Sequence, residues 1–155
     1  MGSKSTSNQL LLRVSAVAVL CLIAFSAAGL ASRWRAQQAA TQQAIHLASE
    51  IFVYERTSSL MLYAHPDLFA HRRELDWPTY LANAKRRLGG LTAIDTIEGA
   101  VTGAGLLRNS NSATAAYTVF TRFASGPAEL EIELIESQEG WLVTRFRILA
   151  QALNQ

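Results

Sequence analysis

The 155-residue chain contains a single cysteine, Cys21, and few charged side chains. One cysteine excludes an intramolecular disulfide, and cysteine usage therefore does not indicate the compartment. Charged residues make up 17% of the chain, whereas an average globular protein has about 25%. The net charge is +2, and the densest basic run, at residues 85–87, is short. A nucleic-acid-binding domain shows a clustered basic face, so we predict no nucleic-acid partner.

Established catalytic signatures are also missing. The sequence has no nucleophile elbow, no phosphate-binding glycine loop and no serine–histidine–aspartate set. Its glycines at 99, 103 and 105 do not have the spacing of a dinucleotide-binding loop. We therefore predict no cofactor and no catalytic residue, and a binding or assembly role is favoured over enzymatic activity.

The chain does have one long uncharged stretch, residues 14–32, between Arg13 and Arg33. A helix needs roughly 20 apolar residues to cross a bilayer. Residues 1–9 form a polar start that contains Lys4, and with Arg13 they resemble the start of an export signal. We predict a cytoplasmic segment at 1–13, a transmembrane helix or signal anchor at 14–32, and an extracytoplasmic domain at 36–155. The predicted location is the inner membrane, with one span and the C-terminal domain in the periplasm.

Other interpretations of this stretch stay open. The small residues 26–29 suit a signal peptidase, which would produce a secreted protein, although Arg33 and Arg35 follow closely. A lipoprotein is disfavoured because a bulky leucine precedes Cys21, where processing needs a small residue. Trp34, between two arginines, suits the interface between membrane and water.

The sequence after the span predicts about three helices. Residues 36 to about 62 lack glycine and proline and are predicted to form one helix. A short helix through Leu68 and Phe69 is expected after the break at Pro66. Another helix begins at Asp76-Trp77-Pro78 and continues to Leu88. On the first helix, small or apolar residues recur at helical spacing and predict one buried face: Ala44, Leu47, Ala48, Ile51, Tyr54 and Ser58.

From Leu91 on, the composition favours strands. A first strand is predicted from Leu91 on, and residues 115–124, 129–134 and 141–149 read as three further strands separated by turns. The glycines at 99, 103 and 105, followed by residues 109–112, read as a loose loop after the first strand. Helices followed by strands predict an α+β fold, in which about three helices pack on a curved antiparallel sheet of about four strands. Cross-strand ion pairs are expected between three glutamates and three arginines: Glu129, Glu131, Glu133, Arg122, Arg145 and Arg147.

Four motifs in this region carry a family resemblance: Trp77-x-x-Tyr80-Leu81, Arg86-Arg87-Leu88-Gly89, Tyr117-x-Val119 and Glu139-Gly140-Trp141-x-Val143. With these motifs and their spacing, residues 44–149 resemble a family of small bacterial envelope proteins of unknown function. That family is grouped with the nuclear-transport-factor-2-like folds. The resemblance implies a cone-shaped α+β domain in the cell envelope, and it implies no defined activity.

Two groups of residues are candidates for chemistry. His65, Asp67, His71 and Glu74 carry metal-ligating side chains, but their spacing matches no zinc pattern and no cysteine joins them. No metal is predicted, and a solvated segment is the preferred interpretation. In an enzyme built on a cone, Asp95 or His71 would be the acid or base at its open end.

Six aromatic side chains are the candidate lining of a pocket between helices and sheet, and the competing interpretation is that they form the core: Tyr54, Tyr63, Trp77, Tyr80, Tyr117 and Trp141. The predicted function is that of a non-catalytic, membrane-anchored binding or assembly module in the periplasm. Its partners would be envelope proteins or a small apolar ligand. A hydrolase- or isomerase-type enzyme is the alternative, and the sequence does not indicate the oligomeric state.

Overall fold

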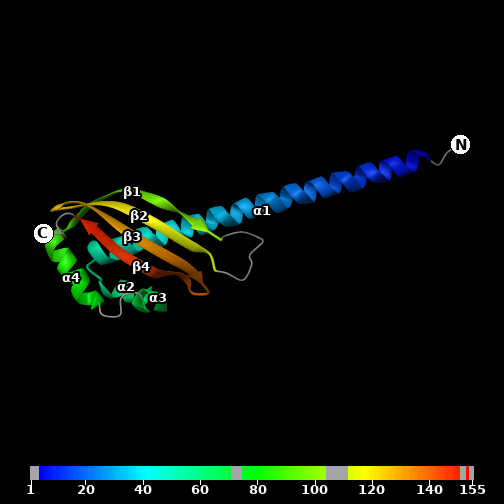
Figure 1. Ribbon diagram of the computed structural model, residues 1–155. Coiled ribbons are helices and arrows are strands. Elements are labelled where there is room, and N and C mark those ends of the chain that lie inside the picture. The colour runs from blue at the N-terminus through cyan, green and yellow to red at the C-terminus, as the bar shows by residue number, and fades with distance from the viewer. Residues whose placement is uncertain (1–3, 71–74, 104–111, 151–152, 154–155) are drawn as a thin grey trace.

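The structure, a computed structural model, describes residues 4–70, 75–103, 112–150 and 153, with side chains from Ala28 onward. Helices precede strands, which confirms the predicted α+β class (Figure 1). The elements in chain order are α1 (Lys4–Phe52), α2 (Ser58–Leu62), α3 (Pro66–Ala70), α4 (Trp77–Leu88), β1 (Leu91–Thr102), β2 (Thr114–Phe123), β3 (Gly126–Ser137) and β4 (Gly140–Ala150).

The strands form an antiparallel four-stranded sheet in the order β1-β2-β3-β4. Along β2 and β3 nearly every second side chain is buried, because successive side chains of a strand point to opposite faces. The buried face packs against the helices, and the opposite face, called the outer face below, carries exposed and half-buried side chains. The core between sheet and helices includes Leu47, Leu81, Val119, Leu130, Ile132 and Val143.

Helix α1 continues without a break from Lys4 to Phe52, and only its C-terminal part packs on the domain. Its first fully buried residue among those with described side chains is Ala40. Four of the six residues predicted to form the buried face are fully covered, namely Ala44, Leu47, Ala48 and Ile51. The N-terminal part projects away from the sheet as a single rod (Figure 1).

The prediction that this helix reaches residue 62 is wrong. The helix ends at Phe52, and the backbone turns at Glu55, which has a φ of 59°. The Arg56 N–H then donates to the Glu50 carbonyl at 2.8 Å, a reversal typical of helix C-termini. Tyr54 is consequently 62% exposed rather than on the buried face, and the separate helix α2 follows.

Among the side chains that the structure describes, no helix offers a stretch both long and apolar enough to cross a bilayer. The side chains of residues 14–27, most of the predicted span, lie outside that description. The span therefore stays a prediction.

Helix α4 begins and ends where the sequence predicts. Asp76 lies just before it in an extended conformation, and Gly89 follows it with a φ of 75°, which suits glycine. The buried residues Trp77, Leu81 and Ala84 share one face of the helix. Gly99, predicted to lie in a loop, instead belongs to β1 and pairs with Tyr117 of β2. The rest of that predicted loop, residues 104–111, lies outside the described residues.

Candidate functional site

The six aromatic residues proposed as a pocket lining lie in different surroundings. Trp77, Tyr117 and Trp141 are buried in the core. Tyr63 and Tyr80 are half-buried; the Tyr63 ring packs edge-on against His46, with a centroid distance of 5.9 Å. Neither of the two surface hollows described below is lined by any of the six.

Within the described residues, the two buried side-chain nitrogen atoms Gln43 Nε2 and Trp77 Nε1 have no hydrogen-bond acceptor. The Trp77 ring packs edge-on against Tyr80 at 5.8 Å. Tyr117, in contrast, is fully engaged: its hydroxyl accepts from Thr41 Oγ1 at 3.1 Å and donates to the Gln37 carbonyl at 3.4 Å. Tyr117 is thus a structural link between β2 and α1.

The metal-ligating residues do not gather in the part of the chain that the structure describes. His65 Nδ1 and Asp67 Oδ2 lie 3.2 Å apart at the start of α3, whereas His71 and Glu74 lie outside the described residues. Among described residues there is no group of three histidine, cysteine, aspartate or glutamate side chains able to hold a metal ion. The His65 backbone has a structural role, since its N–H donates to the Val143 carbonyl of β4 at 2.8 Å.

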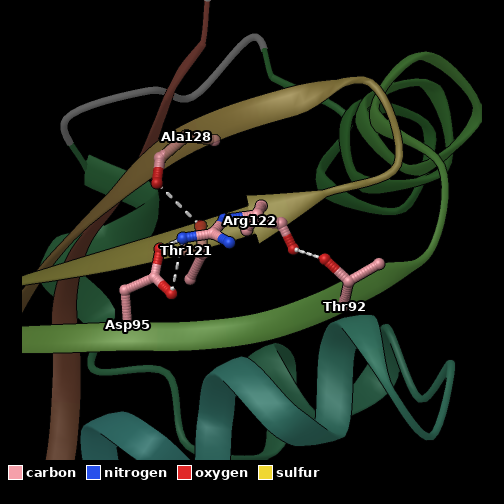
Figure 2. A network of polar contacts seen from close by, with 5 residues as sticks. All are labelled: Thr92, Asp95, Thr121, Arg122 and Ala128. Carbon is pink, nitrogen blue, oxygen red and sulfur yellow. Dashed lines mark hydrogen bonds and ion pairs between the residues drawn. The ribbon is translucent and has the colours of Figure 1, made fainter.

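Asp95, the described candidate for a pocket acid or base, is bound in an ion pair at the sheet surface. The register of β1 against β2 shifts between Ile94 and Thr96, so Asp95 is the extra residue of a β-bulge. Its carboxylate accepts from Arg122 Nη2 through both oxygens, at 3.1 and 3.0 Å (Figure 2). A carboxylate held this way orients a guanidinium; it is not placed in an enclosed cavity.

The same corner of the sheet is tied by two side-chain-to-backbone bonds (Figure 2). Thr92, in a second register irregularity of β1, donates from its hydroxyl to the Arg122 carbonyl at 2.8 Å. Thr121 donates to the Ala128 carbonyl of β3 at 2.7 Å and is buried. Each of the two bonds satisfies a backbone carbonyl at this corner of the sheet.

Charged side chains cover the centre of the outer face. The predicted cross-strand pairs between β3 and β4 are confirmed: Arg145 lies 2.8 Å from Glu133, and Arg147 lies 3.6 Å from Glu131. Arg122 departs from the prediction, because it pairs with Asp95 of β1 and not with a glutamate of β3. Pairs this exposed contribute little to stability, and they leave the charges available to a partner.

Five carboxylates share the outer face with three guanidinium groups, which gives the described part of it a net negative charge. Two of the carboxylates, Glu98 and Glu129, make no ion pair within the described residues. The outer-face charges, placed by the strand registers, are Asp95, Glu98, Glu129, Glu131, Glu133, Arg122, Arg145 and Arg147.

A hollow of ≈ 490 Å³ lies at the Pro127 end of the sheet, beside Asp95. Its lining combines apolar side chains with two carboxylates: Asp95, Phe120, Thr121, Pro127, Ala128, Glu129, Leu149 and Ala150. Phe120, Glu129 and Leu149 occupy neighbouring positions across β2, β3 and β4. The outer face thus offers an apolar depression bordered by negative charge.

A second polar arrangement joins α1 to the edge of the sheet. The Gln37 side-chain amide accepts from the Val101 N–H at 2.9 Å and donates to the Gly99 carbonyl at 3.3 Å. Both backbone groups belong to the edge strand β1, so Gln37 satisfies them as a neighbouring strand would. This contact, together with the Tyr117 hydroxyl, fixes the point at which α1 leaves the domain.

Directly before this junction along α1 lies a hollow of ≈ 530 Å³, called the junction hollow below. Its lining comes from α1 and the end of β1: Arg33, Trp34, Gln37, Val101, Thr102 and Gly103. Trp34 is 63% exposed, and Thr102 Oγ1 bonds to Thr114 Oγ1 at 2.8 Å. The hollow is open, and the described part of its lining carries one guanidinium and no acidic side chain.

No known protein family, no curated protein and no solved structure matches this chain. The resemblance to the nuclear-transport-factor-2-like envelope proteins therefore stays a prediction.

Sequence reasoning identified part of these two surfaces and missed the rest. It placed Arg33 and Trp34 at an interface and expected the outer-face charges to pair across strands. It did not find Gln37 or Gly103, because nothing in the local sequence shows that α1 lies beside the end of β1. It also missed the bulge at Asp95, because a single polar residue in a strand does not show whether it pairs with the neighbouring strand or is an extra, unpaired residue.

Proposed function

We propose that the protein is a membrane-anchored, non-catalytic binding module of the bacterial envelope. In this proposal residues 14–32 span the inner membrane, and the α+β domain stands in the periplasm and binds a partner protein. One observation carries it: α1 is continuous through the uncharged stretch and into the core. A span built on this helix would hold the domain directly at the membrane surface.

The residues at the predicted membrane boundary support this arrangement. Residue 23 is the middle of the uncharged stretch, and Arg33 follows ten residues later. At 1.5 Å per residue that separation is about 15 Å, which is half of the roughly 30 Å hydrocarbon core. Arg33, Trp34 and Arg35 would therefore lie at the headgroup level, where arginine and tryptophan are favoured.

The span is tested by membrane flotation of the full-length chain. We expect wild type to co-float with vesicles and to keep its full-length mass. Ile23→Arg would place a charge at the middle of the span and should release the chain, because that charge opposes insertion by about 2.5–3.5 kcal/mol. The matched control is Ile45→Arg, at a partly exposed position of the same helix within the domain, and it should still float.

Two results would contradict the anchor. If the wild-type chain stays in the soluble fraction, it has no membrane anchor. If its mass lacks the first thirty or so residues, the uncharged stretch is a cleaved signal peptide.

The orientation of the domain is measured with a variant that combines Cys21→Ala and Ser125→Cys, because residue 125 is exposed in the turn between β2 and β3. A membrane-impermeant maleimide should label that cysteine from the periplasmic side only.

The outer face is the binding surface in this proposal. Its net negative charge and the depression at Phe120 favour a partner that presents a basic and apolar segment. Asp95 is already committed to Arg122, so no described observation favours an acid–base enzyme over a binding module.

Site-specific photo-crosslinking tests this surface. A photoreactive residue at position 120 should crosslink a partner in cells, and the same residue at Ala82, an exposed position of α4, should not. Glu98→Lys with Glu129→Lys should abolish the crosslink, because it reverses the two unpaired charges of the outer face. Crosslinking that is equal at both sites, or unchanged by charge reversal, would refute the outer face as the binding surface.

A further inference from the structure

The junction hollow is lined by the guanidinium of Arg33, the exposed indole of Trp34 and the backbone of Gly103, among other groups. Arg33, Trp34 and Gln37 occupy helix positions i, i+1 and i+4, so they lie on one side of α1. Across from them, Val101, Thr102 and Gly103 close the hollow at the end of β1. Its volume of ≈ 530 Å³ lies within the range of ligand sites, about 300–1,000 Å³.

We infer that the junction hollow binds the phosphate headgroup of an anionic membrane lipid, an inference that rests on the proposed membrane span. The guanidinium of Arg33 matches the oxygens of a phosphate diester in pairs. The indole of Trp34 has the amphipathic character that suits the headgroup layer. Because Arg33 lies about 15 Å along the helix axis from the middle of the span, lipid phosphates lie at its level.

The positive charge in the lining favours an anionic ligand, and the position of the hollow at the predicted membrane surface favours a lipid. Among the described residues that line the hollow, Arg33 is the one with a charged side chain, and that charge is positive. Gln37 is held by Val101 and Gly99 of β1, which keeps the domain wall at a fixed distance from Arg33. A lipid headgroup there would contact α1 and the sheet edge together, and so would hold the domain in one orientation on the membrane.

Arg35 is the internal comparison for this site. It lies two residues after Arg33, about 200° around the helix and about 3 Å further along it, and it does not line the hollow. Both arginines would attract a negatively charged membrane equally well through general electrostatics. Only a defined headgroup site distinguishes them.

Fluorescence quenching of Trp34 by brominated lipid measures which lipid occupies the hollow. The full-length chain is reconstituted in phosphatidylcholine vesicles that contain a small share of brominated phosphatidylglycerol, or of brominated phosphatidylcholine for comparison. Trp77 and Trp141 are only 3% and 8% exposed, and Trp34→Phe gives their residual signal.

For wild type we expect phosphatidylglycerol to be preferred about fivefold over phosphatidylcholine at Trp34, the contribution of roughly one arginine at an anionic surface. Arg33→Gln should abolish the preference, and Arg35→Gln should leave it unchanged. Arg33→Lys should restore it in part, because lysine keeps the charge and loses the paired donors.

Three outcomes overturn the inference while leaving the anchor intact: no preference in wild type, equal losses in Arg33→Gln and Arg35→Gln, or full reversal of quenching by free glycerol phosphate. The second indicates general attraction, and the third indicates a soluble phosphate ester as the ligand. A chain that fails to float with vesicles of any composition overturns the anchor and this inference together.

Discussion

Among the described glycines from Gly89 onward, Gly99 leaves the least room for a side chain. It lies in β1 opposite Tyr117, with a φ of 152°, and its carbonyl accepts from Gln37. A methyl group there would overlap the Ala116 carbonyl oxygen and lie 2.5 Å from Tyr117 Cδ1 and 2.8 Å from Tyr117 Cα. Two of these neighbours are backbone atoms, so β1 would have to move away from β2.

The expected cost of Gly99→Ala follows from two contributions. The clash of the added methyl group with the neighbouring strand costs about 1–3 kcal/mol, the range for overpacking, and an unfavourable backbone conformation costs about 1–3 kcal/mol more. Their sum, about 2–6 kcal/mol, is a large part of the roughly 5–15 kcal/mol that stabilises a domain. With a urea dependence of about 1–3 kcal/mol per M, the unfolding midpoint should fall by at least about 0.7 M.

Urea unfolding of the full-length chain in detergent, followed by the fluorescence of Trp77 and Trp141, measures this change. Gly90→Ala is the matched control, because no atom lies within 4 Å of the methyl group it would add. That variant should unfold within about 1 kcal/mol of wild type, on the stabilising side. If Gly99→Ala and Gly90→Ala have the same midpoint, the placement of β1 against Tyr117 is refuted.

Three further changes test local contacts, each by the same urea midpoint. Gln37→Met removes the acceptor of the half-buried Val101 N–H and should cost about 1–2 kcal/mol; amide exchange at Val101 should accelerate, and continued protection would contradict the contact. Glu50→Ala should lower the free energy of unfolding by about 1–3 kcal/mol, because it leaves the buried Ser59 hydroxyl without its acceptor at 3.0 Å. Glu50→Gln keeps an acceptor oxygen and should lose less than half of that free energy. Equal losses in the two variants would exclude this hydrogen bond as the cause. Glu55→Gly should raise stability by about 1 kcal/mol, since glycine adopts the φ of 59° without strain; a lower midpoint would show that the turn after α1 is built differently.

Much of the fold could be predicted from local patterns. The bounds of α4 follow from Asp76 before it and Gly89 after it, since capping residues act within a few positions of a helix end. The strands β2 and β3 follow from strict alternation, because one buried face imposes a period of two. The pairs Arg145–Glu133 and Arg147–Glu131 follow from that register once a short turn joins the two strands.

Three predictions failed, each for a different physical reason. The end of α1 at Phe52 was missed because a left-handed glutamate, Glu55, replaces the expected glycine signal. The assignment of Gly99 to a loop failed because glycine is also used where another backbone approaches closely. The partner of Arg122 was missed because the bulge at Asp95 depends on how β1 packs, and not on its own residues.

By itself, the sequence determined the helix-then-sheet order, the alternation of the strands and the uncharged stretch before Arg33. These features depend on neighbours within a few residues, where backbone geometry and solvent preference act directly. Only the tertiary structure decided that Gln37 lies beside Val101 and that Asp95 faces Arg122. Those contacts join residues distant in sequence, and they form only after the whole core has packed and set the register of each strand.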